Sequence, residues 1–290
     1  MSPESFALTP QVSVHTHACG EEGIFVNAYV IETRNGVVAV DATLTVSTSK
    51  ALRARLERLG KPLLAVLITH PHPDHVAGLA HLVLNEETPI YATAEAIALM
   101  RTIELPKRAQ WTPVFGEEWV QAWRYPNRQI RHGESLTLDG VRYTIHDLGR
   151  GGDCDANAIW IAQADGNKVA FLSDLIFNGV HSYLADGGVL DWLANLERVE
   201  QLCVDCVMAF PGHGAPAQPA TLIAVQRRYL LRYLGALKEV TSDLPHDAAL
   251  DDTRRARLVS AVKADLPDGG LEFLIGLGAD AVLKELRGTH

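Results

Sequence analysis

The chain has 290 residues, 47% of them hydrophobic and 21% charged, a balance typical of a globular protein with a full core. Asp and Glu outnumber Lys and Arg by 35 to 26, which gives a formal net charge of −9, and no dense basic cluster is visible. This balance disfavours binding to nucleic acid phosphates. We therefore expect a small-molecule substrate and no nucleic acid partner, whereas the composition indicates no particular oligomeric state.

The sequence gives no sign of export or of a membrane span. The first residues lack the basic region and apolar stretch of a signal peptide, and no run of about 18 apolar residues occurs. These features predict a cytoplasmic protein that does not bind membranes. Four cysteines do not suggest a disulfide framework in a chain of this length. Cys203 and Cys206 form a CxxC pair, which we interpret as buried structural thiols rather than a redox or zinc site.

The first part of the chain alternates predicted strands and helices. Runs of β-branched and apolar residues predict strands, and apolar residues spaced three or four apart between a Ser or Thr cap and a Gly predict helices. The expected strands are 11–18, 24–32, 37–40, 63–69 and 89–92, and the expected helices are 47–59, about 75–84 and 93–105.

Residues 106–128 have a different character, because they combine many aromatic residues with three prolines and show no clean period. The aromatic residues are Trp111, Phe115, Trp119, Trp123 and Tyr125. Such an irregular stretch is typical of a lid or pocket wall, or of a satellite cluster that packs over the core. Both interpretations are kept open here.

Strand signals return after this stretch, and helices dominate the end of the chain. The expected strands are 134–138, 141–147, 157–163, 168–173 and 207–210, and the expected helices are 190–202, 217–240, 251–264 and 271–287. Two β-rich halves suggest two sheets packed face to face and flanked by helices. We expect one domain over residues 1–290, with a core at about 11–215 and C-terminal helices at about 217–287.

The most informative motif is His70-Pro71-His72-Pro73-Asp74-His75, which directly follows the predicted strand 63–69. Neutral imidazole and carboxylate oxygen are good ligands for zinc, manganese and iron. Four such groups in six residues cannot all reach one ion from a regular strand or helix. A tight loop can divide them between two neighbouring ions, so the motif predicts a binuclear metal enzyme.

Together with other segments in the same order, this motif resembles the metallo-β-lactamase superfamily over residues 24–215. Val40-Asp41 ends a strand, Phe171-Leu172-Ser173-Asp174 ends another, and Pro211-Gly212-His213-Gly214 corresponds to the last motif. The resemblance implies an α+β fold, a four-layer αββα sandwich, here with a C-terminal helical extension.

The resemblance also implies a ligand set for two divalent ions. One ion would be bound by His70, His72 and Asp153, the other by Asp74, His75 and His213, and Asp174 would bridge them. Asp41 is expected to orient a ligand histidine, although a strand-end aspartate that caps a turn is an equally good interpretation.

The third motif departs from the family, which usually places a histidine where this chain has Asp153. An alignment shifted by two residues offers Asp155 instead, and His146 lies inside the preceding strand with a less suitable direction. A third carboxylate makes the site formally neutral and therefore a weaker Lewis acid. Zinc remains the expected metal, but harder carboxylate oxygen lets manganese or iron compete better.

The expected chemistry is hydrolysis, in which a bridging hydroxide attacks an ester, lactone, thioester or amide carbonyl of a small molecule. Asp74 and Asp174 are the expected catalytic residues, and Asp74 or a bound water would protonate the leaving group. Phe177 occupies the position where similar β-lactam-binding proteins often carry lysine and similar lactonases often carry tyrosine. Phe177, His181 and Tyr183 are possible substrate contacts.

Other functions remain open. A mononuclear-iron oxygenase of the same fold would require a degraded second site, and a flavodiiron protein would require an acidic residue at His72 and a flavin domain. A non-catalytic binding protein with a degraded metal site is favoured only by Asp153. His15 and His17 share a strand face and are interpreted as structural residues.

Overall fold

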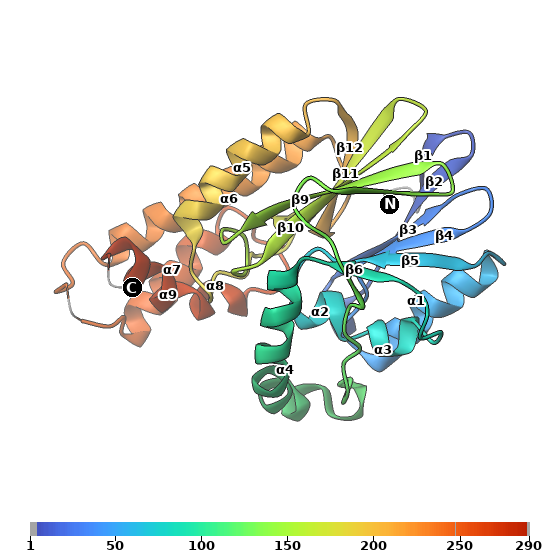
Figure 1. Ribbon diagram of the computed structural model, residues 1–290. Helices are drawn as coiled ribbons and strands as arrows, with labels where there is room; N and C mark the ends of the chain where they lie inside the picture. Colours follow the sequence, from blue (N-terminus) through green and yellow to red (C-terminus); the bar gives the residue numbers. More distant parts are fainter. Residues whose placement is uncertain (1–4, 247, 289–290) are drawn as a thin grey trace.

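The computed structural model describes residues 5–246 and 248–288. Two sheets pack face to face, and helices cover the outer face of each sheet (Figure 1). The four-layer αββα arrangement expected from the sequence is therefore confirmed.

The first sheet has seven strands in the order β1-β2-β3-β4-β5-β6-β7. It is antiparallel from β1 to β4 and parallel from β4 to β7. Its strands are β1 (Ser5–Thr9), β2 (Val12–Ala18), β3 (Asn27–Glu32), β4 (Val37–Val40), β5 (Leu63–Leu67), β6 (Ile90–Ala92) and β7 (Arg128–Gln129). The parallel part places the carboxyl ends of β4 and β5 at the same edge.

The second sheet has five strands in the order β12-β11-β10-β9-β8, with β11 and β12 parallel and the other pairs antiparallel. Its strands are β8 (Ser135–Leu138), β9 (Val141–Gly149), β10 (Asn157–Ala164), β11 (Asn167–Phe177) and β12 (Cys206–His213). The inner faces of the two sheets meet in an apolar core. In that core the Tyr29 ring packs against Phe171 and Phe210, with ring centroids 5.5 and 5.1 Å away.

Helices cover the outer face of each sheet. The first sheet carries α1 (Val46–Arg58), α2 (Pro73–Val76), α3 (Leu79–Leu82) and α4 (Ala94–Phe115), and the second carries α5 (Val189–Leu202) and α6 (Pro219–Val240). The cap signals work as expected, since the side chains of Thr45 and Thr93 accept hydrogen bonds from the third residue of α1 and α4.

The C-terminal helices α7 (Asp252–Lys263), α8 (Phe273–Leu277) and α9 (Ala279–Leu286) form a lobe that packs on α6 and on each other. Two backbone hydrogen bonds attach the chain just before α8 to the segment after β11: the His181 amide donates to the Gly270 carbonyl at 2.9 Å, and the Gly270 amide donates to the Gly179 carbonyl at 3.4 Å. This attachment brings residues 271–274 close to the end of the second sheet.

The predicted elements are wrong in two respects. Strands β1 and β7 were not predicted, and two expected helices are each divided in two. The expected helix 75–84 is divided into α2 and α3 at Gly78, where a side chain would lie only 2.6 Å from the Thr43 carbonyl oxygen. The expected helix 271–287 is similarly divided at Gly278.

The largest error concerns residues 106–128, of which the first part is helical. Helix α4 continues through Pro106 and Pro113 to Phe115, and these exposed prolines hid the helical period from the sequence analysis. The later part contains Trp119 and Trp123, which are buried in the core between the first sheet and its helices.

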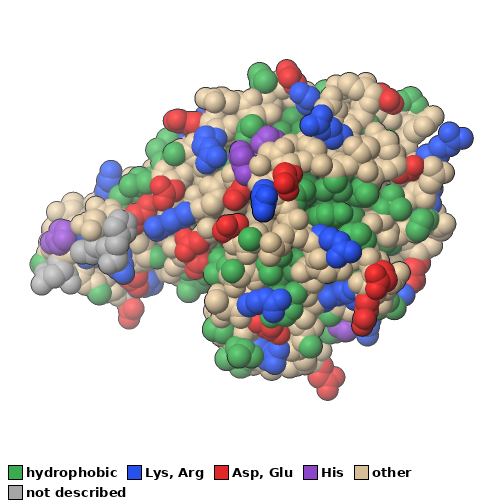
Figure 2. Space-filling model, in the orientation of Figure 1, with side chains coloured by type: hydrophobic (Ala, Val, Ile, Leu, Met, Phe, Trp, Pro, Cys, Tyr) green, Lys and Arg blue, Asp and Glu red, His purple; other side chains and the backbone are tan. Residues whose placement is uncertain are grey.

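The surface gives two further facts. On the face shown in Figure 2, Lys and Arg side chains are interspersed with Asp and Glu. Among the helices of the described residues, none is both long and apolar enough to traverse a bilayer.

Candidate metal centre

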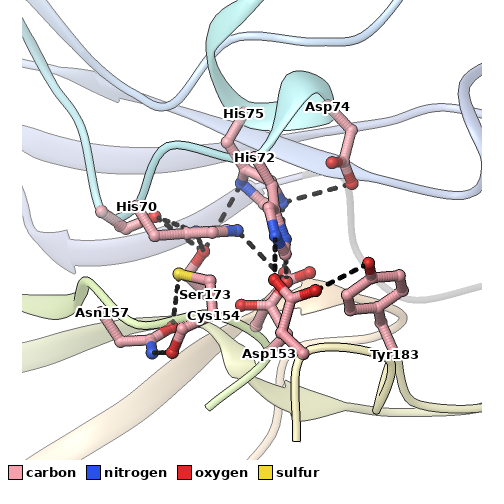
Figure 3. Close-up of polar contacts among 12 residues, drawn as sticks. His70, His72, Asp74, His75, Asp153, Cys154, Asn157, Ser173 and Tyr183 are labelled. Atoms are coloured by element: carbon pink, nitrogen blue, oxygen red, sulfur yellow. Dashed lines mark hydrogen bonds and ion pairs between the residues drawn. The ribbon is translucent and has the colours of Figure 1, made fainter. Parts of the chain in front are cut away.

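The ligand residues predicted from the sequence meet at one edge of the sandwich, where strands from both sheets end. Asp41 follows β4, the histidine motif follows β5, Asp174 lies near the end of β11, and His213 is the last residue of β12. Asp153 comes from the loop that joins β9 to β10. Figure 3 shows the histidines and Asp74 on one side of the centre, and Asp153 and Tyr183 on the other.

The two prolines of the histidine motif explain how four ligand groups point in different directions. Pro73 is the first residue of α2, a position where the missing N–H costs no hydrogen bond. His72 is therefore in extended conformation before the helix, whereas Asp74 and His75 lie in its first turn. The change of backbone conformation within the motif turns its side chains toward two separate groups of residues.

The first group consists of His70, His72 and Asp153, whose ligand atoms lie within 4.8 Å of one another. Asp153 Oδ2 is in close contact with His72 Nδ1 and lies 3.4 Å from His70 Nε2. All three side chains are buried. Two imidazoles and a carboxylate could supply three of the four ligands of a tetrahedral site.

The second group consists of Asp74, His75, Asp174 and His213, again within 4.8 Å of one another. His75 Nε2 lies 3.1 Å from Asp174 Oδ1 and 3.4 Å from Asp74 Oδ2. His213 Nε2 lies 3.2 Å from Asp174 Oδ2 and 3.4 Å from Asp74 Oδ2. Asp174 therefore groups with these residues; the cluster of His70, His72 and Asp153 does not include it.

The hydrogen bonds of the centre test whether these residues fit metal ions. His70 Nε2, His75 Nε2, Asp153 Oδ1 and Asp174 Oδ1 are buried and form no hydrogen bond of good geometry, although His75 Nε2 and Asp174 Oδ1 face each other at 3.1 Å. Buried polar atoms in native proteins are almost always hydrogen-bonded, so a cluster of exceptions requires an explanation. Divalent ions explain it, because these atoms are the ones with which imidazole and carboxylate bind metals. The residues therefore fit bound divalent ions.

Asp41 lies behind the second group and holds its histidine. Its Oδ2 is 2.9 Å from His75 Nδ1 and accepts a hydrogen bond from Thr69 Oγ1 at 2.7 Å, while its Oδ1 accepts one from the Thr69 amide at 2.9 Å. A carboxylate on Nδ1 leaves Nε2 of the same ring directed at the metal position. This is the geometry that an orienting role for Asp41 requires.

Sequence analysis did not anticipate the hydroxyl groups that connect the two halves of the centre. Thr69 Oγ1 lies 3.1 Å from His70 Nδ1 and 2.8 Å from Ser173 Oγ. Thr69 and Ser173 directly precede the predicted ligands His70 and Asp174 in the sequence. A hydroxyl residue next to a ligand was the only signal in the sequence for this role.

The backbone of the centre is strained at two of these positions. Asp41 and Ser173 have φ values of 59° and 47°, a left-handed conformation that is uncommon outside glycine and clusters at functional sites. Gly212 is required for a different reason, because a Cβ atom there would lie 1.7 Å from Asp174 Oδ1.

Opposite charges shift the pKa values of this centre in the metal-free protein. Burial lowers the pKa of His72, but the Asp153 carboxylate outweighs burial and raises it to about 10. Burial likewise lowers the pKa of His213, but Asp174 and Asp74 raise it to about 9. Burial raises the pKa of Asp174, but the charges of His75 and His213 hold it well below its usual range. In the metal-free protein, His72 and His213 therefore retain protons near neutral pH.

These shifts predict opposite pH dependences of stability with and without metal. A raised histidine pKa stabilises the metal-free fold fully below pH 6.5, and this contribution is lost as pH rises through 9 to 10. Metals displace the same protons, so they bind better at higher pH. We expect the Tm of EDTA-treated protein to fall from pH 6.5 to 10 and the Tm increase on adding zinc to be larger at pH 8.5 than at pH 6.5. Scanning fluorimetry measures both, and a zinc effect independent of pH would contradict the expectation.

The centre opens into a pocket of ≈ 600 Å³, counting the part open to solvent. His72, Asp74, Asp153, Asp174 and His213 form one end of it. The rest of the lining is mostly apolar and includes Trp111 and Phe115 from α4 together with Leu271, Phe273 and Leu274. A mainly apolar lining with a few convergent polar groups is typical of a small-molecule site. The aromatic segment therefore contributes to a pocket wall through α4 and to the core through Trp119 and Trp123.

The three possible substrate contacts have different positions. Phe177 lines the pocket and stacks on His213, with ring centroids 4.9 Å apart. Tyr183 also lines it, with its ring 5.2 Å from that of His72. His181 does not reach the pocket lining, because it is fully buried beside Tyr229, whose hydroxyl oxygen is 3.3 Å from His181 Nδ1.

The other candidates from the sequence lie away from the centre. Asp155 is exposed, 3.5 Å from Arg150 Nε. The His146 ring packs against His132, and His15 forms an ion pair of 2.8 Å with Glu32. Cys203 and Cys206 are both buried and unbridged.

Sequence analysis missed Asp186, which contacts the first group from outside. Its Oδ2 lies 3.5 Å from His72 Nε2, and its Oδ1 accepts a hydrogen bond of 3.1 Å from the Tyr183 hydroxyl. The residue lies in the turn-like stretch Ala185-Asp186-Gly187-Gly188, which carries no signal of a site.

Comparison with known proteins agrees with this geometry. The family model described as "Metallo-beta-lactamase superfamily" matches residues 22–213. A metallo-beta-lactamase type 2 of Bacillus cereus is 26% identical over 214 residues, which cover 71% of this chain and 75% of that protein. Ribonuclease TTHA0252 of Thermus thermophilus is 32% identical over 113 residues, covering 38% of this chain and 26% of the ribonuclease. The chain thus matches only about a quarter of that relative.

A solved structure extends the likeness to almost the whole chain. A beta-lactamase domain protein from Burkholderia ambifaria superimposes with a TM-score of 0.72 at 17% identity, covering 99% of this chain and 90% of the other. At this identity the comparison establishes the fold alone.

Proposed function

We propose that this chain, which belongs to the metallo-beta-lactamase superfamily, is a hydrolase that uses two divalent ions to cleave an ester, lactone, thioester or amide bond of a small molecule. The observation that carries the proposal is the pair of ligand groups with unpartnered atoms at the end of an apolar pocket. The family's members include many metal-dependent hydrolases, and both relatives named above are hydrolases by name. We also propose that residues 1–290 form one domain, because Leu271, Phe273 and Leu274 line the same pocket as the ligand residues.

The protein side of the reaction follows from the positions of the side chains. His70, His72 and Asp153 would hold one ion, and Asp74, His75, Asp174 and His213 would hold the other, zinc being the most suitable metal. Bound divalent ions supply acidified water and polarise the carbonyl group. Asp74 lines the pocket, so it is the carboxylate placed to deliver a proton to the leaving group. Asp41 and Thr69 keep His75 oriented throughout.

Two alternatives are less well supported. A mononuclear-iron oxygenase would have no use for the four residues of the second group, all of which are present and buried. A binding protein with a degraded site does not explain four unpartnered ligand atoms in one cluster. Manganese and iron remain possible metals, since the carboxylate of Asp153 suits harder ions.

Metal analysis combined with a substrate panel tests the proposal. Protein reconstituted with zinc, manganese or iron should bind two ions per chain and hydrolyse at least one of an ester, lactone, thioester or β-lactam substrate. EDTA treatment should abolish that activity, and re-addition of the metal should restore it. One iron per chain with oxygen consumption would support the oxygenase instead, and protein that binds no metal would refute both.

A further inference from the structure

The pocket combines an apolar slot with one positive charge. Lys107, Trp111 and Phe115 all line the pocket and lie four residues apart on α4, so they share one face of the helix. At 1.5 Å per residue, this face extends for about 12 Å. Leu271 and Phe273 line the pocket from the C-terminal lobe. Among the residues that line the pocket, Lys107 is the only lysine or arginine.

Lys107 is held at the pocket without an acidic partner. Its Nζ lies 5.3 Å from the centroid of the Tyr183 ring, a cation–π distance, and donates a long hydrogen bond of 3.5 Å to the Tyr183 hydroxyl. Within residues 5–246 and 248–288, no carboxylate forms an ion pair with it. The half-buried Lys107 side chain brings a positive charge to an apolar wall, where it favours a ligand that supplies a negative charge.

Asp186 is the nearby carboxylate that would be expected to neutralise Lys107, but its oxygens have other partners. One accepts the Tyr183 hydroxyl, and the other faces His72 Nε2. The Tyr183 side chain thus stands between the two charges and contacts both. The charges of Asp186 and Lys107 still attract each other. Because no carboxylate of the described residues lies within ion-pair distance, Lys107 can still pair with an anion in the pocket that it lines.

We propose that the pocket selects substrates that carry both an anionic group and an extended apolar body, and that Lys107 binds the anionic group. The apolar body would lie between the α4 face and Phe273. The proposal adds a substrate class to the hydrolase function above. It rests on that function, because a molecule bound in this pocket is a substrate only if the protein is an enzyme. A carboxylate is the simplest such anion, because a flexible ammonium group recognises it as a point charge.

The distances set where the anion lies relative to the reacting bond. The centroid of the Tyr183 ring lies 5.2 Å from that of the His72 ring and 5.3 Å from Lys107 Nζ. The same tyrosine ring is therefore next to both the anion site and the first metal group. The carboxylate and the cleaved carbonyl would belong to one small molecule, several bonds apart.

Calorimetry with a matched pair of ligands tests the role of Lys107 without relying on turnover. We expect 6-phenylhexanoate to bind at least about tenfold more tightly than 6-phenylhexanamide, on both zinc-loaded and EDTA-treated protein. Lys107→Met should weaken binding of the carboxylate by about 10- to 100-fold, the loss expected for a hydrogen bond to a charged group. It should leave binding of the amide unchanged, and Lys107→Arg should retain most of the preference.

A second lysine provides the control for net charge. Lys238→Met changes the charge of the exposed face of α6 by the same amount and should leave both affinities unchanged. Carboxylate affinity that is equal in wild type and Lys107→Met would overturn the proposal, as would an equal drop in Lys238→Met.

A variant of Phe273 tests the apolar part of the proposed site. Phe273 is 55% exposed, so Phe273→Ser should fold normally. We expect it to weaken binding of 6-phenylhexanoate several-fold and not that of acetate. Unchanged phenylhexanoate affinity would remove Phe273 from the slot.

The outcomes also separate this inference from the proposed function. Charge-selective binding without hydrolysis of any ester would retain the anion site and refute the hydrolase. Hydrolysis with the same KM for acidic and neutral esters in wild type and Lys107→Met would retain the hydrolase and refute the anion site.

Discussion

Replacing His72 with alanine should remove one of two bound ions and reduce turnover by more than about 100-fold. Loss of a residue that only hydrogen-bonds to a metal ligand typically costs about 10- to 100-fold, and loss of the ligand itself should cost more. His72 contributes Nδ1 to the first group and is held there by Asp153 on one side and Asp186 on the other. Without it, only His70 and Asp153 remain in that group, which is too few for a stable site. Elemental analysis of the purified variant and a rate measurement on the best panel substrate check the two parts.

The His72 experiment needs a control for folding, because breaking a buried ion pair costs about 3–5 kcal/mol. His72→Asn can still donate a hydrogen bond to Asp153, so it should fold like the wild type by circular dichroism and still lose the ion. His146→Ala removes a histidine outside the centre and should retain both ions. Two ions and near-normal rates in both His72 variants would refute the proposed mechanism.

Replacing Asp153 with histidine should increase zinc affinity by at least about tenfold and shift activity toward lower pH. A third imidazole in place of a carboxylate raises the net charge of the loaded site by one, and a more positive site lowers the pKa of bound water. Imidazole is also the softer ligand and favours zinc over manganese. Asp153 lines the pocket, so the larger ring has space on that side. Competition with a chromophoric chelator measures affinity, and a pH–rate profile measures the shift.

Asp155→His is the matched control for this change. Asp155 lies two residues away, is exposed, and faces Arg150. Its variant should bind zinc like the wild type. If Asp155→His changed zinc affinity and Asp153→His did not, the alignment shifted by two residues would be correct, and Asp153 would not be a ligand.

The metal motif could be predicted because its signal is local. His70, His72, Asp74 and His75 lie within six residues, and the prolines between them mark the end of a strand. Asp174 and His213 required the family resemblance, since each is a single residue whose partners lie far away in sequence. The structure brings all of them together, along with Asp153, for which the sequence offered two alignments.

The pocket wall could not be predicted, for two physical reasons. Pro106 and Pro113 are exposed on α4 and interrupt the apolar pattern, so the four-residue spacing from Lys107 to Phe115 was not recognised as helical. Leu271 and Phe273 reach the pocket because backbone hydrogen bonds attach Gly270 to the segment after β11. Backbone hydrogen bonds between distant segments leave no mark in side-chain patterns. The same limitation explains why His181 was expected near substrate, although its side chain points into the interior.

The attachment of Gly270 to the segment after β11 has a consequence for how such a protein changes in evolution. The residues that would hold the ions lie within 22–213, the region matched by the family model, whereas Leu271, Phe273 and Leu274 lie outside it. Mutations in the C-terminal lobe can therefore change the lining of the pocket without changing the residues that would hold the ions. Proteins that descend from one ancestor could therefore differ in substrate specificity while keeping the same metal-binding residues.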